Sequence, residues 1–267
     1  MNNRLSNIID DLERAGRLNV TAAQLAALLP ETSADALRQA LHRQQRRGRL
    51  VRLSRGTRHW AIVPLAHAAS GAPPLETWLH RFLATTVKTP YYVGLLSAAE
   101  TYGISPYAAT VTQVMVPSQR RPMRAGRQRI VFHTRTRLDK LPTRWHETPD
   151  GRFLVSTPEL TMLDLVRRQD LVGGLSRAGE VIAELTTHAT AEGLMIALSA
   201  AADGPSAQRL GALLSLQGSP LADTVAAWIA EHPPRRTIPL TSKLSGTVER
   251  DAVFHVLRPT HPIPSRT

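Results

Sequence analysis

"LRQALHRQQRRGRLVRLSRGTRHWAI", residues 37–62, carries eight Arg and no Lys, Asp or Glu. Leu37 and Leu41 lie four residues apart, which is the spacing of a buried face on an α-helix. Gly48 marks the end of that helix. The runs "RLVRLS" and "RHWAIV" that follow are rich in β-forming residues and meet at Arg55-Gly56, as is typical of a hairpin turn. The stretch therefore predicts a basic helix followed by a basic hairpin.

Two further helices are predicted before this stretch. The first runs from Asn3 to Ala15, because apolar residues recur there at helical spacing, at Leu5, Ile8, Ile9 and Leu12. The second covers residues 22–29, with Thr21 as its N-cap and Pro30 after its end. Ser33 is the expected N-cap of the basic helix. Three helices and a hairpin within 63 residues are the order of elements in a winged helix-turn-helix domain.

The composition predicts a folded cytoplasmic protein. Hydrophobic residues make up 42% of the 267 residues, enough to bury a core. No apolar run approaches the ~18 residues of a membrane-spanning helix. The polar, amphipathic first residues are unlike a secretory signal. The chain has no Cys, so disulfides and thiolate chemistry are excluded.

The net charge of +12 is concentrated in two zones. Residues 1–65 hold eleven basic and five acidic residues, and residues 117–147 hold nine basic and two acidic residues. The two zones thus carry +6 and +7, and the rest of the chain is nearly neutral. A genome that favours Arg over Lys explains part of the Arg content, but it does not explain the clustering. Two basic zones on a neutral protein favour a polyanionic partner.

The domain boundary is predicted in "VPLAHAASGAPPL", residues 63–75, which is rich in Ala, Pro and Gly. We expect a winged helix-turn-helix domain at residues 1–66, a linker at 67–74 and a second domain at 75–267, with the two domains folding separately. In the second domain we expect helices at 75–87, within 91–105 and from 157 to about 231. Strands are expected at 110–118, 128–134 and 152–157, with two more in the tail. The predicted fold class is α+β, with a winged helix-turn-helix followed by a larger mixed α/β domain.

The basic helix and hairpin are the predicted interface with double-stranded DNA. In a winged helix the third helix lies in the major groove, so Arg38, Gln39 and Arg43 are the expected base readers, with His42 on the same outer side. Phosphate contacts are assigned to the helix end and hairpin, at Arg46, Arg47, Arg49, Arg52, Arg55 and Arg58. The alternatives are a solvated basic face and a winged helix that contacts only protein.

The second basic zone contains "SQRRPMRAGRQR", residues 118–129, between two strand-like runs. We expect an exposed hairpin loop that adds accessory phosphate contacts through Arg120, Arg121, Arg124, Arg127 and Arg129. A solvated loop is the alternative, as is contact with RNA or an acidic partner.

The motifs "YYVGLLSAAETYGIS" and "VSTPELTMLDL" resemble the AbiEi family of antitoxins from type IV toxin–antitoxin systems. The family pattern is a tyrosine, an "hLSAL-x-x-HG" helix, a strand pair, "TPERTLLDL" and then "RLGYLLE". The matching residues are Tyr91, Tyr92, Leu96, Ser97, Ala98, Gly103, Thr157, Pro158, Glu159, Leu163, Asp164, Leu165, Arg209, Leu210, Gly211, Leu213 and Leu214. The sequence departs from the pattern at Tyr102, where the family often has His, at Leu160, where it often has Arg, and in the tail.

The resemblance implies an antitoxin that represses its own promoter and counteracts a nucleotidyltransferase-like toxin, without a stable complex between the two. A stretch such as "TPE" is also ordinary fold architecture, so structural roles are expected for Ser97, Glu100, Pro158, Glu159 and Asp164.

No enzyme signature is complete, so we expect no catalytic residue, cofactor or metal site. "LVGGLSRAG" lacks the Lys-Ser/Thr of a phosphate loop, and the His residues have no metal-ligand spacing. None of Lys88, Lys140 and Lys243 has an acid two residues before it, as a restriction-type nuclease requires. The alternative function is a winged-helix transcription factor whose second domain senses a small molecule. Whether the protein is a monomer or a dimer is left open by the sequence.

Overall fold

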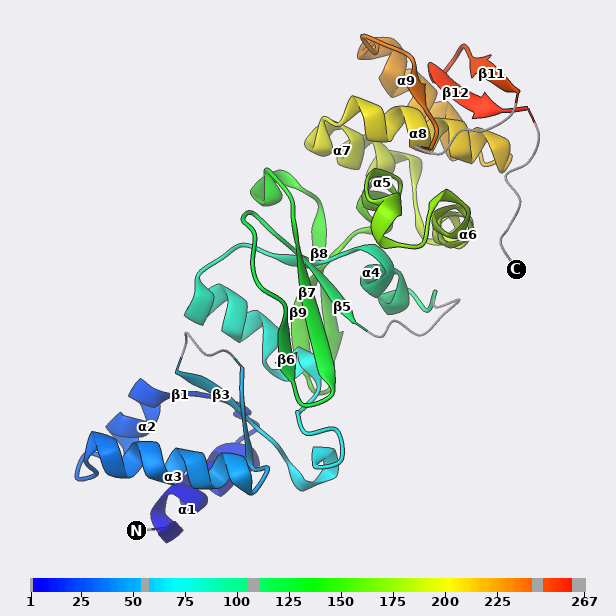
Figure 1. The fold of residues 1–267 in the computed structure, drawn as a ribbon. Helices are drawn as coiled ribbons and strands as arrows, with labels where there is room; N and C mark the ends of the chain where they lie inside the picture. The colour runs from blue at the N-terminus through cyan, green and yellow to red at the C-terminus, as the bar shows by residue number, and fades with distance from the viewer. Residues whose placement is uncertain (1, 54–57, 105–110, 242–246, 261–267) are drawn as a thin grey trace. The chain divides into compact units, whose positions relative to one another are not determined.

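The computed structural model describes residues 2–53, 58–104, 111–241 and 247–260 (Figure 1). Its first six elements form what we call the N-terminal module, residues 2–63. They are α1 (Asn2–Arg14), β1 (Asn19–Thr21), α2 (Ala22–Leu28), α3 (Ala34–Arg46), β2 (Leu50–Arg52) and β3 (His59–Ile62). The three helices and two strands predicted here are confirmed. Strand β1 was not predicted, because three residues are too few to show an alternating pattern. The turn expected at Arg55-Gly56 lies outside the described residues.

Side-chain caps begin α2 and α3 where the sequence predicts them. The Thr21 Oγ1 accepts the N–H of Gln24 at 3.3 Å, and the Gln24 Oε1 accepts the N–H of Thr21 at 2.9 Å. This reciprocal pair is a capping box. The Ser33 Oγ accepts the N–H of Ala36 at 3.2 Å. Both expected N-caps are therefore confirmed.

The N-terminal module has one continuous core. Its strands form an antiparallel sheet in the order β1-β3-β2, with Val20 opposite Trp60 and Val51 opposite Ala61. The buried side chains come from all three helices and all three strands: Leu5, Ile9, Leu12, Val20, Leu25, Leu29, Leu37, Ala40, Leu41, Leu50, Trp60 and Ile62. Burial of this set fixes the inner face of α3 and leaves its other face to solvent.

The segment after the module is ordered and less regular than expected. It contains the 3-10 turns η1 (Leu65–His67) and η2 (Leu75–Thr77) and the π-helical turn η3 (Arg81–Val87). The prediction of one α-helix over 75–87 is therefore wrong in detail, because two shorter helical turns of other types occupy this segment. The backbone at Trp78 leaves the helical region, with φ −134°, and Trp78 and Leu79 are both fully buried.

The central sheet has six strands in the order β6-β7-β5-β4-β9-β8. They are β4 (Tyr92–Val93), β5 (Thr112–Val116), β6 (Met123–Ala125), β7 (Gln128–Thr134), β8 (Thr143–Thr148) and β9 (Gly151–Ser156). Strand β5 pairs with β7 in parallel, so the two do not form a hairpin. The intervening β6, which was not predicted, runs antiparallel to β7. The arginine-rich loop predicted at 118–129 therefore consists of the segment that leads into β6 and of the β6–β7 hairpin itself. Arg124 and Arg129 lie in the strands of this hairpin.

The remaining chain is mainly helical. Its helices are α4 (Leu95–Thr101), α5 (Pro158–Arg167), α6 (Leu175–Leu185), α7 (Ala191–Ala201), α8 (Gly204–Leu216) and α9 (Leu221–Glu231), with 3-10 turns η4 (Leu138–Lys140), η5 (Gln169–Leu171) and η6 (Thr186–His188). Gly173 and Gly174, with φ +90° and +99°, separate α5 from α6. A small sheet in the order β10-β12-β11 ends the described chain: β10 (Ile238–Pro239), β11 (Val248–Asp251) and β12 (Val256–Pro259). The part of the tail that the structure describes thus has three strands where two were expected.

Contacts group the chain into two compact units. The first contains residues 1–91, 110–136 and 145–154, and the second contains residues 92–109, 137–144 and 155–267. The N-terminal module, residues 64–91 and the β6–β7 hairpin therefore belong to one unit. The domain boundary expected at 67–74 is a statement about which parts of the chain fold independently. Grouping residues by their contacts does not test independent folding, so this boundary stays a prediction.

Candidate nucleic-acid interface

The outer face of α3 carries a stripe of basic and polar side chains. Leu37, Ala40, Leu41 and Gln44 are its buried residues. Arg38, Gln39, His42 and Arg46 are exposed, and Arg43 is half-buried beside them. These five lie three or four residues apart, so they share one side of the helix. The stripe lies where helical periodicity predicts it.

Two part-buried hydrogen bonds orient α3. The Gln44 Nε2 donates to the Ser6 Oγ of α1 at 2.7 Å. The Trp60 Nε1 of β3 donates to the Gln45 Oε1 at 2.7 Å. These bonds hold α3 from both sides, so the direction of the exposed stripe is fixed. Sequence reasoning missed both, because a mid-helix Gln has no partner that can be read from spacing.

Arg38 is paired with Asp35 on the surface of α3, and each side chain is about three-quarters exposed, at 73% and 76%. An exposed pair of this kind contributes little to stability and is screened by salt. The Arg38 guanidinium can therefore exchange this partner for a ligand at low cost.

Arg49 faces the other way. Its guanidinium donates to the carboxylates of Asp10 and Glu13, the latter at 2.9 Å, and to the Val63 carbonyl at 3.1 Å. Burial disfavours its charge, but these two carboxylates outweigh burial, and the pKa of Arg49 is raised. Among the residues assigned to phosphates, Arg49 is thus engaged within the module.

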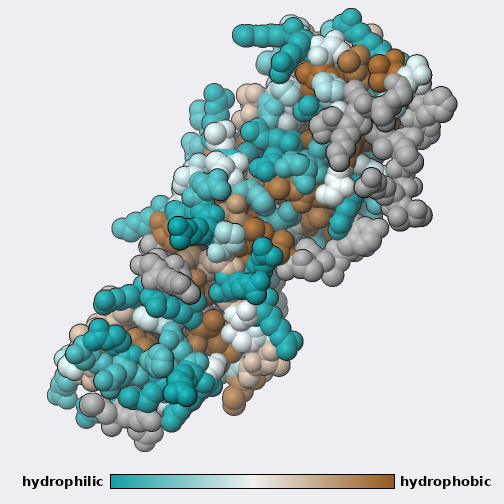
Figure 2. All heavy atoms as spheres, in the orientation of Figure 1, coloured by the Kyte–Doolittle hydropathy of each residue, from teal (hydrophilic) through white to brown (hydrophobic). Residues whose placement is uncertain are grey.

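The other predicted phosphate-binding residues that the structure describes are exposed: Arg46 and Arg47 at the end of α3, Arg52 in β2 and Arg58 before β3. Arg55 lies outside the described residues. Hydrophilic residues cover most of the visible face of the N-terminal module, at lower left in Figure 2. The described side chains thus form a basic surface that extends from α3 to the sheet.

The β6–β7 hairpin carries the first part of the second basic zone, and residues 120–129 are called the basic hairpin below. Arg121, Arg124, Arg127 and Arg129 are exposed, and Arg120 is half-buried. Arg124 and Arg129 lie directly opposite each other in the ladder. Like charges at opposite positions repel, so an anion bound between them would relieve that repulsion. Neither residue has an ion pair within the described part of the chain.

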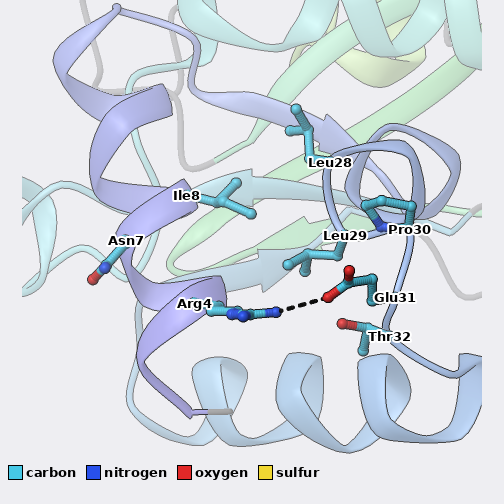
Figure 3. Close-up of a pocket in the computed structure, with 8 residues that line it drawn as sticks. All are labelled: Arg4, Asn7, Ile8, Leu28, Leu29, Pro30, Glu31 and Thr32. Atoms are coloured by element: carbon cyan, nitrogen blue, oxygen red, sulfur yellow. Dashed lines mark hydrogen bonds and ion pairs between the residues drawn. The ribbon is translucent and has the colours of Figure 1, made fainter.

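A pocket of 320 Å³ lies between α1 and the α2–α3 turn (Figure 3). Ile8, Leu28 and Leu29 line it, and the 3.4 Å ion pair between Arg4 and Glu31 lies at its edge. Both charged side chains are at least 70% exposed. The lining is mainly apolar, and its polar groups do not converge on one point as they do in most ligand-binding sites, so we assign no ligand to this pocket.

The family motifs of the second unit have structural partners. The Thr157 Oγ1 accepts the N–H of Leu160 at 3.3 Å and caps α5. The buried Glu159 accepts the N–H of Thr190 at 2.9 Å, at the start of α7. The Tyr92 hydroxyl donates to the buried Asp164 at 2.7 Å. These hydrogen bonds therefore join β4, α5 and α7, and they give Glu159 and Asp164 the structural roles that the sequence predicts for them.

Tyr102 replaces the His that the family often has. Its hydroxyl donates to the Ser156 carbonyl, and the Arg144 guanidinium lies 4.3 Å from its ring centre. Burial raises the pKa of Tyr102 to about 12. The phenol therefore stays a hydrogen-bond donor at neutral pH.

Across the described residues, no group of three or more His, Asp or Glu is arranged to hold a metal ion. No helix among them combines the length and the apolar character needed to cross a membrane.

Residues 92–216 match the family described as the AbiEi antitoxin C-terminal domain. No curated relative matches the chain. Among solved structures, the RV2827C protein from Mycobacterium tuberculosis is similar, with a TM-score of 0.66 and 19% identity over 94% of this chain and 90% of that chain. This likeness shows a shared fold. The chain is therefore AbiEi-like, and its similarity to the antitoxin domain of this family lies in residues 92–216.

Proposed function

We propose that this chain is a cytoplasmic antitoxin that binds its own promoter as a repressor and counteracts a nucleotidyltransferase-like toxin. The N-terminal module is a winged helix-turn-helix in this proposal. Its support is the order α1-β1-α2-α3-β2-β3 and the antiparallel sheet β1-β3-β2. In such domains the helix after the turn enters the major groove.

The observation that carries DNA binding is the exposed stripe of α3, on a helix held by Gln44 and Gln45. Arg38 and Arg43 are assigned to guanine edges and Gln39 to an adenine edge, because these side chains match those bases in two-point hydrogen bonds. A fixed helix presents them with little loss of conformational freedom on binding.

Phosphate contacts are assigned to the side chains around this stripe. Arg46, Arg47, Arg52 and Arg58 are exposed beside the helix end and on the sheet. Such contacts position a protein on DNA and raise affinity for every sequence. The basic hairpin is assigned accessory phosphate contacts, because its arginines lie in the same compact unit as α3. Arg49 is assigned to the module's own stability, since its partners are Asp10 and Glu13.

The test of base reading compares full-length variants on the chain's own promoter DNA and on random DNA. Arg38→Ala and Arg43→Ala should each weaken operator binding by about 1–3 kcal/mol and relax sequence preference. Arg235→Ala is the matched control, because Arg235 is an exposed arginine near β10. Fluorescence anisotropy measures both affinities. Equal losses on operator and random DNA would show that α3 does not read bases.

In this proposal the toxin is the product of a neighbouring gene, and co-expression with that product tests the antitoxin role. The double variant Arg38→Ala/Arg43→Ala should lose promoter repression in a reporter assay and still relieve growth arrest, because residues 92–216 are unchanged. Mixing the purified proteins should give no stable complex. Loss of both activities in a well-folded double variant would contradict this separation.

A further inference from the structure

We propose that a glycine-to-glycine backbone contact fixes the basic hairpin to residues 64–74 and thereby sets which phosphates its arginines reach relative to α3. Residues 64–74 are called the strap. The proposal rests on the DNA binding proposed above and adds positioning residues to it, Gly126 and Gly71.

The strap is a hydrogen-bonded turn. The Ser70 Oγ lies 2.8 Å from the carbonyl oxygens of both His67 and Ala72, and its one hydrogen can be donated to either. The Gly71 N–H donates to the His67 carbonyl at 3.1 Å. Ala72 is only 1% exposed. The segment rich in Ala, Pro and Gly therefore has the properties of a fixed element, although its composition predicts a linker.

The turn of the basic hairpin lies directly against this strap. Gly126 has φ +57°, and a Cβ there would lie 2.3 Å from the Ser70 carbonyl oxygen. A Cβ at Gly71, φ +71°, would lie 3.2 Å from the Gly126 Cα. The Cβ at Gly126 would meet backbone atoms, which cannot rotate away. Only glycine at 126 permits this approach without a shift of the chain.

Two hydrogen bonds between the basic hairpin and the strap fix the orientation of the hairpin at this contact. The Arg127 N–H donates to the Ser70 carbonyl at 2.9 Å. The Gln128 Nε2 donates to the Pro73 carbonyl at 2.9 Å. The strap begins immediately after the N-terminal module, and all of these residues belong to the same compact unit as α3. The hairpin is therefore held at a fixed place and does not search for DNA on a flexible tether.

The contact acts on arginines that neighbour it in the chain. Arg127 follows Gly126 directly, and Arg124 and Arg129 form the opposed pair next to the turn. All three are exposed. Holding them in place removes the ordering cost that a mobile loop would add on binding. The expected result is a DNA footprint with flanking phosphate contacts at a constant offset from the bases under α3.

The experiment uses the full chain on its own operator. Gly126→Ala should remove flank protection in a hydroxyl-radical footprint and leave protection under α3 unchanged. The log–log salt slope should become shallower by about 3 and the affinity should fall about tenfold, because three phosphate contacts are lost. The triple variant Arg124→Ala/Arg127→Ala/Arg129→Ala should show the same pattern. Gly218→Ala is the matched control, since Gly218 has φ +67° with nothing within 4 Å of its Cβ position.

A second measurement needs no DNA. Gly126→Ala should speed hydrogen exchange at the Arg127 amide at least tenfold and leave α5 amides unchanged. If this substitution prevents folding, Gln128→Ala removes only the side-chain bond to Pro73 and should shorten the flank footprint. Unchanged exchange would overturn the contact itself. A wild-type footprint and salt slope in a variant with faster exchange would overturn its role in DNA binding. Failure of the wild-type chain to bind its operator would instead overturn the proposed function.

Discussion

Neighbouring arginines of the N-terminal module have different partners. Arg49 bonds to two carboxylates and a carbonyl, and only 22% of its side chain is exposed. Arg46, three residues earlier, is exposed and has no ion pair among the described residues. Proximity in sequence thus says little about role. A guanidinium already bonded within the protein must break those bonds before it can bind a phosphate.

This difference predicts opposite phenotypes for two alanine variants. Arg49→Ala should lower the free energy of unfolding by about 1–2 kcal/mol, because Asp10 and Glu13 lose their shared partner. Its operator affinity should change less than about twofold. Arg46→Ala should leave stability within about 0.5 kcal/mol and weaken all DNA alike. Urea unfolding and anisotropy measure the two quantities. A destabilised Arg46→Ala or a DNA-binding defect confined to Arg49→Ala would reverse the assignments.

His59 predicts a pH dependence of stability. It is buried, its Nε2 lies 2.6 Å from the Asn19 Oδ1, and its ring meets that of Phe82 edge-on. Burial, with a smaller effect of the Arg81 charge, lowers the pKa of His59 to about 4. Between the ordinary pKa of about 6.5 and about 4, the unfolded chain binds a proton that the folded chain does not. Stability should therefore fall as pH drops through this range, by at most about 1.4 kcal/mol per pH unit.

The check is urea unfolding between pH 7.5 and 4.5 for the wild type and for His59→Gln, which keeps an N–H donor without titrating. The stability of the variant should depend less steeply on pH. Parallel profiles for the two proteins would mean that His59 does not titrate differently in the folded and unfolded states.

At the scale of elements, Gly211 shows why a motif residue is glycine. A Cβ on this α8 residue would lie 2.3 Å from two ring atoms of Phe254, which precedes β12. Gly211→Ala should therefore lower the free energy of unfolding by about 1–3 kcal/mol through overpacking. Adding Phe254→Leu should recover part of the loss. Gly204→Ala, at the start of the same helix with open space around it, is the control. Equal stability of Gly211→Ala and the wild type would show that the tail sheet can move away from α8.

The sequence predicts the elements with strong local signals. Thr21 and Ser33 begin helices as expected, since capping depends on residues within one turn. Strands β1, β4, β6 and β8 were missed; β1, β4 and β6 have only two or three residues each, and β8 is the edge strand of its sheet. The parallel pairing of β5 with β7 and the contact of Gly126 with Gly71 depend on residues far apart in the chain. No local pattern encodes such partners. The sequence therefore predicts where the basic residues lie along the chain, but it does not predict which other segments the basic hairpin packs against.

At the scale of the whole molecule, the distribution of charge predicts how binding responds to salt. Exposed arginines occur on α3, on the module's sheet and on the basic hairpin. Six or more phosphate contacts should give a log–log slope of operator affinity against salt of about −5 or steeper. Anisotropy titrations of the full chain at several salt concentrations measure this slope. A slope near −1 would mean that most of these arginines only solvate the surface.

The hydrogen bond from the Trp60 indole to Gln45 also makes α3 visible to spectroscopy. An indole ring whose N–H is hydrogen-bonded to an amide fluoresces at a different wavelength and with a different quantum yield from an indole ring whose N–H contacts water. Trp60 is 6% exposed, so its emission depends mainly on the position of the helix against the sheet. With the other three Trp changed to Phe, the protein would carry an unlabelled optical reporter, and stopped-flow mixing with DNA could then show directly that α3 keeps its position as DNA binds.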